Sequence, residues 1–323
     1  MWQLSSYAAR QLSKSQLLFK NLAAWLLSRL AAKRKVKVKM KKVLVTGAKG
    51  MLGQDLCPIL EDEGYEVIET DVDTLDITDF EQVESVLADK IPDIVVHCAA
   101  YTNVDKAEED LETARLINSK GTENLAKVCS KFGMTLVYIS TDYVFDGTKT
   151  EPYTPDDEPC PINNYGLTKL EGEQAVQKYC EKYYITRTAW LYGHHGKNFV
   201  ETMISLADKP ELKVVDDQIG CPTWTVELAN GIVKLLKGEP FGIYHVCGSG
   251  STSWYGFAKE IFNLYASLRG GEADAAIQTN LKPCTTDEFP RPAKRPKNSI
   301  MDNNKICRNW KTALKNYIEL RDF

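Results

Sequence analysis

The chain has 323 residues, of which 43% are hydrophobic, and a formal net charge of −4. This length suits one large α/β domain with a smaller lobe, and the apolar content is sufficient for a buried core. The acidic balance argues against a nucleic-acid-binding protein, because such proteins carry a basic surface.

Residues 1–39 differ from the rest of the chain, because they contain nine Lys and Arg residues and no acidic residue before Asp55. Their leucines fall at helical spacing, so the segment resembles a transit peptide or a membrane-surface helix. Its apolar stretch at 22–32 is interrupted by Arg29 and is too short to span a bilayer. A third interpretation, which we favour, is an over-long gene start, since Met40 opens what looks like a dinucleotide-binding domain. The segment is left out of the predicted fold in either case.

Residues 40–188 alternate between strand-like and helix-like segments and are predicted to form an NAD(P)-binding domain. Short apolar runs predict strands at 43–46, 65–70, 93–98, 135–140 and 184–188. Helical patterns lie between them, at 54–63, 80–89, 113–132 and 165–183. This alternation predicts an α/β fold with a Rossmann-type, doubly wound parallel sheet that has helices on both faces.

Residues 189–323 follow a looser pattern and are predicted to be mainly a smaller α/β substrate-binding lobe, with segments that return to the sheet. Short strands are expected at 212–215 and 244–246, and helices at 225–236, 253–268 and 310–320. Residues 282–295 are rich in proline and charge and predict a loop.

The first predicted strand runs into a glycine turn that a helix follows. Gly47 permits the tight turn, Gly50 lets the backbone approach a pyrophosphate, and Gly53 lets the helix pack on the strand. The helix N-terminus then offers free N–H groups to the anion. The spacing is G-x-x-G-x-x-G, so an ordinary glycine turn is the alternative. The strand before, the helix after and the later acidic residue Asp71 favour a nucleotide site.

Asp71 ends the second predicted strand, close to the spacing at which a carboxylate accepts the adenosine ribose hydroxyls. A carboxylate there repels a 2′-phosphate, and residues 54–89 contain no Lys or Arg, so NADH is slightly favoured over NADPH. Lys49 could still bind a 2′-phosphate, and an exposed turn residue is the alternative for Asp71. Asp76 is expected to accept from the adenine amino group and Ile77 to pack on the ring, unless Asp76 only caps the next helix.

Tyr165 and Lys169 lie four residues apart in a predicted helix and therefore share one face. An ammonium beside a phenol favours phenolate, so we expect Lys169 to lower the pKa of Tyr165 towards neutrality. Such a tyrosine can protonate a carbonyl oxygen as hydride arrives at carbon. A lone Y-x-x-x-K is usually a solvated helix face, but this one follows Thr141 at the carboxyl end of a strand, where open α/β sheets bind ligands. Thr141 would give the carbonyl oxygen a second hydrogen bond, unless it only caps the strand.

Several motifs in order resemble the extended short-chain dehydrogenase/reductase family. They are TGAKGMLG at 46–53, HCAAYTNVDKAE at 97–108, NSKGT at 118–122, STDYVFDG at 140–147 and YGLTKLEGE at 165–173. Later segments resemble the narrower family of dTDP-4-dehydrorhamnose reductases: RTAWLYG at 187–193, GKNF at 196–199, DDQIGCPT at 216–223, and Arg295-Pro296 with Ser299. The resemblance runs from Met40 to about Lys305.

The resemblance implies a role for each matching residue. The cofactor would contact Gly47, Gly50, Met51, Leu52, Gly53, Cys98, Ala99, Ala100 and Tyr101. His97-Cys98 departs from the Asn-Ala that is usual in the family. Tyr165 would be the acid, Lys169 would tune it and bind the nicotinamide ribose, and Thr141 would polarise the ketone. Asn118 would carry a water or hold the local backbone in the proton relay.

The sugar nucleotide would contact Thr141, Asp142, Tyr143, Trp190 and Arg295. Trp190 would lie against the sugar ring and Arg295 would pair with the diphosphate. From the residues alone, Trp190 is equally a core residue and Arg295 a solvated loop residue.

The implied activity is NADH- or NADPH-dependent reduction of the 4-keto group of dTDP-4-dehydro-L-rhamnose to dTDP-L-rhamnose, in nucleotide-sugar and cell-surface polysaccharide biosynthesis. Two alternatives stay open: an epimerase or dehydratase with tightly bound NAD, and a non-catalytic regulatory subunit resembling that of methionine adenosyltransferase. No metal site is predicted, although some members of the family use Mg²⁺ at a dimer contact and Glu108-Glu109-Asp110 could hold one.

The nine cysteines are odd in number and form no C-x-x-C pair, which favours reduced thiols over a disulfide framework or a zinc site. We therefore expect a cytoplasmic protein with a soluble core domain, with targeting by residues 1–39 left open. A dTDP-keto-sugar is the expected substrate, a homodimer is a further expectation, and nucleic acid is not an expected partner.

Overall fold

A computed structural model of the chain describes residues 40–268 and 280–321. The expectations for residues 1–39 lie outside the described residues. Within the described ranges, no helix combines the length and the apolar character that crossing a bilayer requires.

Six parallel strands form the central sheet, in the order β10-β5-β4-β3-β1-β2. Their bounds are β1 Lys42–Thr46, β2 Glu66–Thr70, β3 Ile94–His97, β4 Thr135–Thr141, β5 Tyr183–Thr188 and β10 Gly242–His245. The prediction of a doubly wound parallel sheet is confirmed. The chain direction reverses between β1 and β3, and ligands of open α/β sheets bind at such a switch point.

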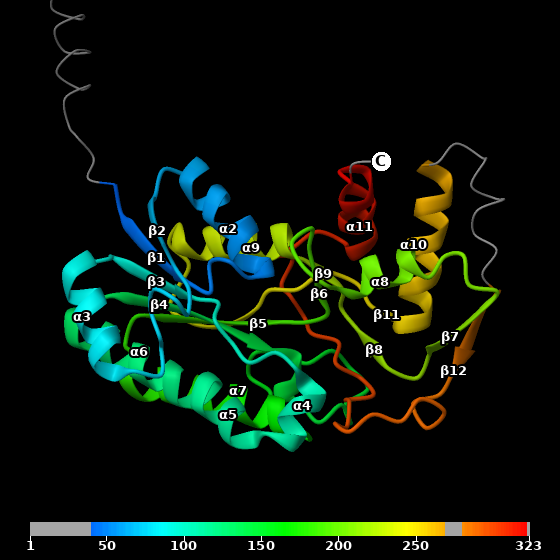
Figure 1. Cartoon of the computed structure of the whole chain (residues 1–323), viewed down its shortest axis with the longest axis horizontal. Helices are drawn as coiled ribbons and strands as arrows, with labels where there is room; N and C mark the ends of the chain where they lie inside the picture. The colour runs from blue at the N-terminus through cyan, green and yellow to red at the C-terminus, as the bar shows by residue number, and fades with distance from the viewer. Residues whose placement is uncertain (1–39, 269–279, 322–323) are drawn as a thin grey trace, which may run out of the picture. The chain divides into compact units, whose positions relative to one another are not determined.

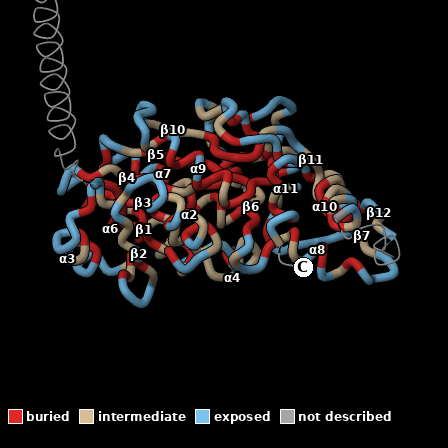
Figure 2. Tube along the Cα trace, turned by 90° about the horizontal axis from the view of Figure 1, so that it is seen from above, coloured by how far each residue is buried: buried red, intermediate tan, exposed pale blue. Residues whose placement is uncertain are grey.

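Helices cover both faces of the sheet (Figure 1). One face carries α2 (Met51–Asp62) and α9 (Thr225–Leu236), and the other carries α3 (Phe80–Lys90), α6 (Thr122–Phe132) and α7 (Asn164–Tyr179). Val43 and Val45 pack on the first face and Leu44 on the second, because successive side chains of a strand point to opposite sides. Figure 2 shows buried residues running through the strands, as burial on both faces requires.

The segment before α6 differs from the single helix expected at 113–132. It contains α4 (Val104–Glu109), α5 (Leu111–Arg115) and a π-helical turn at Leu116–Gly121. The side chains of Asn103 and Asp110 accept hydrogen bonds from the N–H groups of Lys106 and Thr113, so each starts a new helix. Helical periodicity alone does not reveal these two caps or the extra residue of a π turn.

The C-terminal part contains α8 (Phe199–Ser205), α10 (Trp254–Leu268) and α11 (Trp310–Glu319) around an aromatic core. Short strands flank it, in the pairs β6 (Leu191–Tyr192) with β9 (Thr223–Trp224), β8 (Ile219–Gly220) with β11 (Thr252–Ser253), and β7 (Glu211–Val215) with β12 (Asn280–Cys284). A 3₁₀ turn at Asp142–Val144 follows β4.

The loop predicted at 282–295 is wrong at its start, because β12 pairs in parallel with β7 through Cys284. Pro283 is tolerated there because a two-stranded sheet consists of edge strands, where an N–H can be spared.

Candidate active site

A cavity of about 990 Å³ opens at the carboxyl ends of β1, β3 and β4, at the switch point of the sheet. One end is lined by the glycine turn, and the other by residues of α7 and of the C-terminal part, including Trp190 and Trp254. Its volume lies at the upper end of the range for small-molecule and cofactor sites, which suits two ligands placed end to end.

The glycine turn is built for close backbone contact. Gly47 has a φ of +66°, and a Cβ at this position would lie 2.7 Å from the backbone nitrogen of Ala99. A Cβ at Gly53 would lie 2.5 Å from the Cα of Ala48, so only glycine lets α2 approach the turn. Gly50 is the N-cap of α2 and supplies no capping side chain, which leaves the first N–H groups of the helix available to an anion. Gly50, Met51, Leu52 and Gly53 all line the cavity. These residues fit a pyrophosphate.

Asp71 lies at the cavity wall after β2, where both of its carboxylate oxygens accept backbone hydrogen bonds. One accepts from the N–H of Lys49 at 2.9 Å and the other from the N–H of Val72 at 2.9 Å. The ammonium of Lys49 lies 2.5 Å from the carboxylate of Asp73, and this exposed pair raises the pKa of Lys49 and lowers that of Asp73. Lys49 is therefore engaged by a second carboxylate beside the one expected to bind the ribose.

Asp76 and Ile77 also line the cavity. Asp76 accepts from the N–H and the hydroxyl of Thr78, at 2.9 and 2.7 Å. The capping alternative for Asp76 is wrong, because Asp79 is the N-cap of α3. Ile77 also packs against the π turn, where a Cβ at Gly121 would lie 2.7 Å from its Cδ1.

Asn118 is buried in the π turn and holds the segment that follows β3. Its Oδ1 accepts from the N–H of Tyr101 at 2.8 Å, and its Nδ2 donates to the carbonyl of Tyr101 and to the hydroxyl of Thr168, both at 3.1 Å. Cys98, Ala99 and Ala100 line the cavity, whereas Tyr101 is not among the lining residues. Of the two roles suggested for Asn118, these contacts correspond to holding the backbone.

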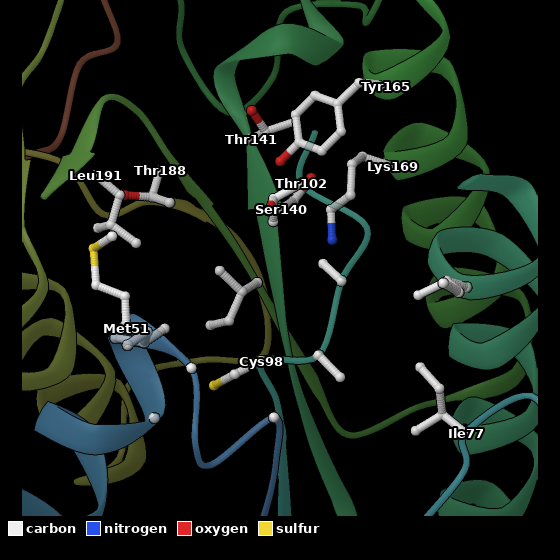
Figure 3. Close-up of a pocket in the computed structure, with 18 of the residues that line it drawn as sticks. Met51, Ile77, Cys98, Thr102, Ser140, Thr141, Tyr165, Lys169, Thr188 and Leu191 are labelled. Carbon is white, nitrogen blue, oxygen red and sulfur yellow. The ribbon is translucent and has the colours of Figure 1, made fainter. Parts of the chain in front are cut away.

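The side chains of Thr141, Tyr165 and Lys169 converge on one part of the cavity (Figure 3). Figure 3 shows Met51, Cys98 and Leu191 on the wall opposite Lys169. The Lys169 ammonium lies 4.1 Å from the centroid of the Tyr138 ring, and the side chain is buried. A hydroxyl pair with a neighbouring cation is an arrangement that can polarise and protonate a carbonyl oxygen.

The expected lowering of the Tyr165 pKa by Lys169 is wrong. Burial raises the pKa of Tyr165 to about 12, since it disfavours phenolate more than the hydrogen bond with Thr141 favours it, and the charge of Asp142 raises it further. Burial also lowers the pKa of Lys169 to about 7, against the opposing effect of the Glu173 carboxylate. Desolvation, which the spacing of two residues does not reveal, dominates both groups.

The residues expected to bind the sugar nucleotide lie close together, since Arg295 also contacts Tyr143, but Arg295 does not itself line the cavity. Asp142, Tyr143 and Trp190 line the cavity, and Arg295 is not among the lining residues. A guanidinium nitrogen of Arg295 instead lies 2.5 Å from the Asp105 carboxylate and 2.6 Å from the carbonyl of Ala293. In this structure Arg295 ties its loop to α4.

Trp254 is a lining residue that the sequence analysis missed. Its ring stacks on Trp190 with centroids 3.6 Å apart and an interplanar angle of 5°. Trp190 has a φ of +48°, which is strained for a non-glycine residue, and a Cβ at Gly220 would lie 2.5 Å from its indole. No local motif marks Trp254, because its contact with Trp190 joins segments 64 residues apart (254 minus 190).

Two residues of the acidic run at 108–110 form hydrogen bonds at the starts of helices. Glu108 accepts from the N–H of Asn164 at 2.8 Å, and Asp110 caps α5. Among the residues that the structure describes, no group of three or more His, Cys, Asp or Glu side chains is arranged to hold a metal ion.

Comparison with known proteins identifies relatives over most of the chain. The family model described as RmlD substrate binding domain matches residues 40–321. A dTDP-4-dehydrorhamnose reductase of Streptomyces griseus is 43% identical over 285 residues, which cover 84% of this chain and 91% of the relative. The spore coat polysaccharide biosynthesis protein SpsK of Bacillus subtilis is 42% identical over 289 residues, covering 87% and 98%.

Solved structures agree with these relatives. The dTDP-4-dehydrorhamnose reductase of Clostridium acetobutylicum is 48% identical, with a TM-score of 0.81 over 86% of this chain and 99% of that one. The Bacillus anthracis dTDP-4-dehydrorhamnose reductase, in complex with NADP, is 41% identical, with a TM-score of 0.81 over 87% and 100%. A UDP-glucose 4-epimerase of Thermus thermophilus is 21% identical, with a TM-score of 0.70 over 86% and 98%, and shares the fold.

Proposed function

The chain belongs to the RmlD substrate binding domain family, and we propose that it is an NAD(P)H-dependent oxidoreductase that reduces the 4-keto group of dTDP-4-dehydro-L-rhamnose to dTDP-L-rhamnose. The observation that carries this proposal is one continuous cavity, which has an anion-binding glycine turn at one end and Thr141, Tyr165 and Lys169 at the other. A dinucleotide with its pyrophosphate on the glycine turn would extend along this cavity toward those three side chains.

The bound nicotinamide supplies the hydride, and the protein supplies the proton and the fixed geometry. Thr141 and Tyr165 donate hydrogen bonds to the ketone oxygen, and Tyr165 releases its proton to that oxygen as charge develops there. Lys169, in its protonated form, holds the nicotinamide ribose at this end of the cavity. Asn118 holds the backbone of Tyr101 beside this site.

The pH dependence of the reaction should reflect the loss of the proton from the Lys169 ammonium. Tyr165 keeps its proton up to a pKa of about 12, so loss of the acid does not limit the reaction near neutrality. Lys169, with a pKa of about 7, is charged below that value and neutral above it. We therefore expect kcat/KM for the keto-sugar to fall as pH rises through about 7, and Lys169→Met to remove this inflection. An inflection near 7 that persists in Lys169→Met would assign it to another group.

Cofactor preference should depend on the exposed charges near the ribose. We propose a modest preference for NADH, because Asp71 and Asp73 are both acidic and Asp73 engages Lys49. Asp73→Asn removes one carboxylate and releases Lys49, so kcat/KM for NADPH relative to NADH should rise by about 2- to 5-fold. Asp89→Asn, which breaks the similarly exposed pair with Lys90, is the matched control and should leave the ratio unchanged. An unchanged ratio in Asp73→Asn would show that the Asp73 carboxylate does not set the cofactor preference.

The proposed activity is tested by following oxidation of NADH and of NADPH at 340 nm, with enzymatically generated dTDP-4-keto-sugar and the chain begun at Met40. Stoichiometric formation of dTDP-L-rhamnose supports the proposal. A folded protein that binds the cofactor but consumes none with this substrate would overturn it. The family resemblance also implies a homodimer, which light scattering tests. Some members of the family use Mg²⁺, and an assay after EDTA treatment tests whether this chain needs it.

A further inference from the structure

His97 is a buried histidine at the end of β3 whose two ring nitrogens both contact threonine hydroxyls. Its Nδ1 lies 2.8 Å from Oγ1 of Thr46 in β1, and its Nε2 lies 3.1 Å from Oγ1 of Thr122 in α6. All three side chains are at most 1% exposed. The imidazole therefore bridges the strand that leads into the glycine turn and the helix that follows the π turn.

The direction of each hydrogen bond follows from counting protons. Thr122 has one hydroxyl proton, and its Oγ1 lies 2.6 Å from the carbonyl oxygen of Asn118, which can only accept. With its proton given to Asn118, the Thr122 oxygen accepts from His97, which places the ring proton on Nε2. The Nδ1 of a neutral ring then has no proton, and the Thr46 hydroxyl donates to it. The Thr46 oxygen is left free to accept the N–H of Ala99, at 3.4 Å.

The charge state agrees with this assignment. Burial, together with the charge of Lys169, lowers the pKa of His97 to about 3, so the ring is neutral at physiological pH. A neutral imidazole offers one donor and one acceptor, and the two threonines use both.

The bridge ends on two groups that belong to the candidate site. On one side, Thr46 receives the N–H of Ala99, a cavity-lining residue. On the other side, the Thr122 hydroxyl contacts the carbonyl of Asn118. The Asn118 side chain is hydrogen-bonded to the backbone of Tyr101 and to the hydroxyl of Thr168 on α7. Thr168 in turn donates to the carbonyl of Tyr165 at 3.0 Å.

We propose that His97, as its Nε2–H tautomer, is a positioning residue that holds the cofactor wall after β3 in register with Asn118 and the helix that carries Tyr165. Its effect on turnover rests on the proposed function, whereas its tautomer and its charge do not. His97 is not among the residues that line the cavity, and it acts through Thr46 and Thr122.

The tautomer is tested by two-dimensional ¹H–¹⁵N correlation spectra of the imidazole rings in the full chain. The chain has four histidines, so His97→Gln assigns its signals by their loss. We expect a protonated Nε2 and an unprotonated Nδ1, with no protonation of the ring between pH 5 and 8. A protonated Nδ1, or titration in that range, would overturn the proposal whether or not the protein reduces the keto-sugar.

The coupling to turnover is tested by Thr122→Val, which keeps the volume and removes the hydroxyl. Thr202→Val is the matched control, because Thr202 makes the same hydroxyl bond to a carbonyl four residues earlier, at 2.8 Å to Asn198, without a histidine. We expect kcat to fall 5- to 20-fold in Thr122→Val, with KM for NADH within 2-fold, and no change in Thr202→Val. Equal kcat values in the two variants would overturn the coupling.

Substitution of His97 itself separates hydrogen bonding from packing. Glutamine can place an amide donor near the Nε2 position and should keep kcat within 3-fold of the parent, whereas His97→Leu fills the space without a donor and should resemble Thr122→Val. Equal losses in both variants would show that His97 only fills volume and would overturn the proposal. Thermal unfolding of each variant confirms that the compared proteins are folded.

Discussion

Replacement of Tyr165 by Phe is expected to lower kcat for the keto-sugar by about 10²- to 10⁴-fold, the usual contribution of a positioned general acid. The substitution removes only the hydroxyl, and the ring keeps its edge-on contact with Tyr143, whose centroid is 5.8 Å away. The affinity for NADH should therefore stay within about 2-fold. Single-turnover oxidation of NADH measures the effect on the chemical step.

Tyr179→Phe is the matched control for this prediction. Tyr179 lies on the same helix, α7, and its hydroxyl donates to Glu123 at 3.3 Å, outside the cavity. Its loss should leave kcat unchanged. A Tyr165→Phe variant with full turnover would remove Tyr165 from the mechanism, and equal losses in both variants would indicate a general weakening of α7.

Replacement of Glu173 by Gln is expected to destabilise the protein by about 3–5 kcal/mol, because it leaves a buried arginine without its counter-charge. Glu173 and Arg187 are 1% and 2% exposed, and two hydrogen bonds of 3.0 and 2.8 Å join them. The carboxylate also accepts from the Ser140 hydroxyl at 2.5 Å. The free energy of unfolding in urea measures the loss.

Two further variants test whether the loss of stability comes from the buried ion pair. Glu171 lies on the same helix as Glu173 and forms a more exposed ion pair with Arg115 of α5. Glu171→Gln breaks this pair and should lower the free energy of unfolding by less than about 1 kcal/mol. Glu173→Gln combined with Arg187→Met removes both buried charges and should recover most of the lost stability. If Glu173→Gln were no more destabilising than Glu171→Gln, the buried ion pair would not be a major determinant of stability.

Features that depend on a few neighbouring residues were predicted well from the sequence. Apolar runs located the first five strands of the sheet to within a residue or two, because strands buried on both faces must be continuously apolar. The glycine turn and the Tyr165–Lys169 pair were found because tight turns and helix faces are set by spacings of three or four residues. The fold class and the location of the site follow from these local patterns.

Features that depend on distant segments required the tertiary structure. Pairing of Arg295 with Asp105 joins residues 190 apart, and β12 was missed because its partner β7 lies about 70 residues earlier. The pKa values of Tyr165 and Lys169 follow from how far the folded chain excludes water from them, which their spacing does not show. The hydrogen-bonding state of His97 likewise depends on Thr46 and Thr122, which only the sheet and its covering helix bring together. Sequence thus determined the elements and the reacting groups, whereas long-range packing and desolvation decided their charge and their partners.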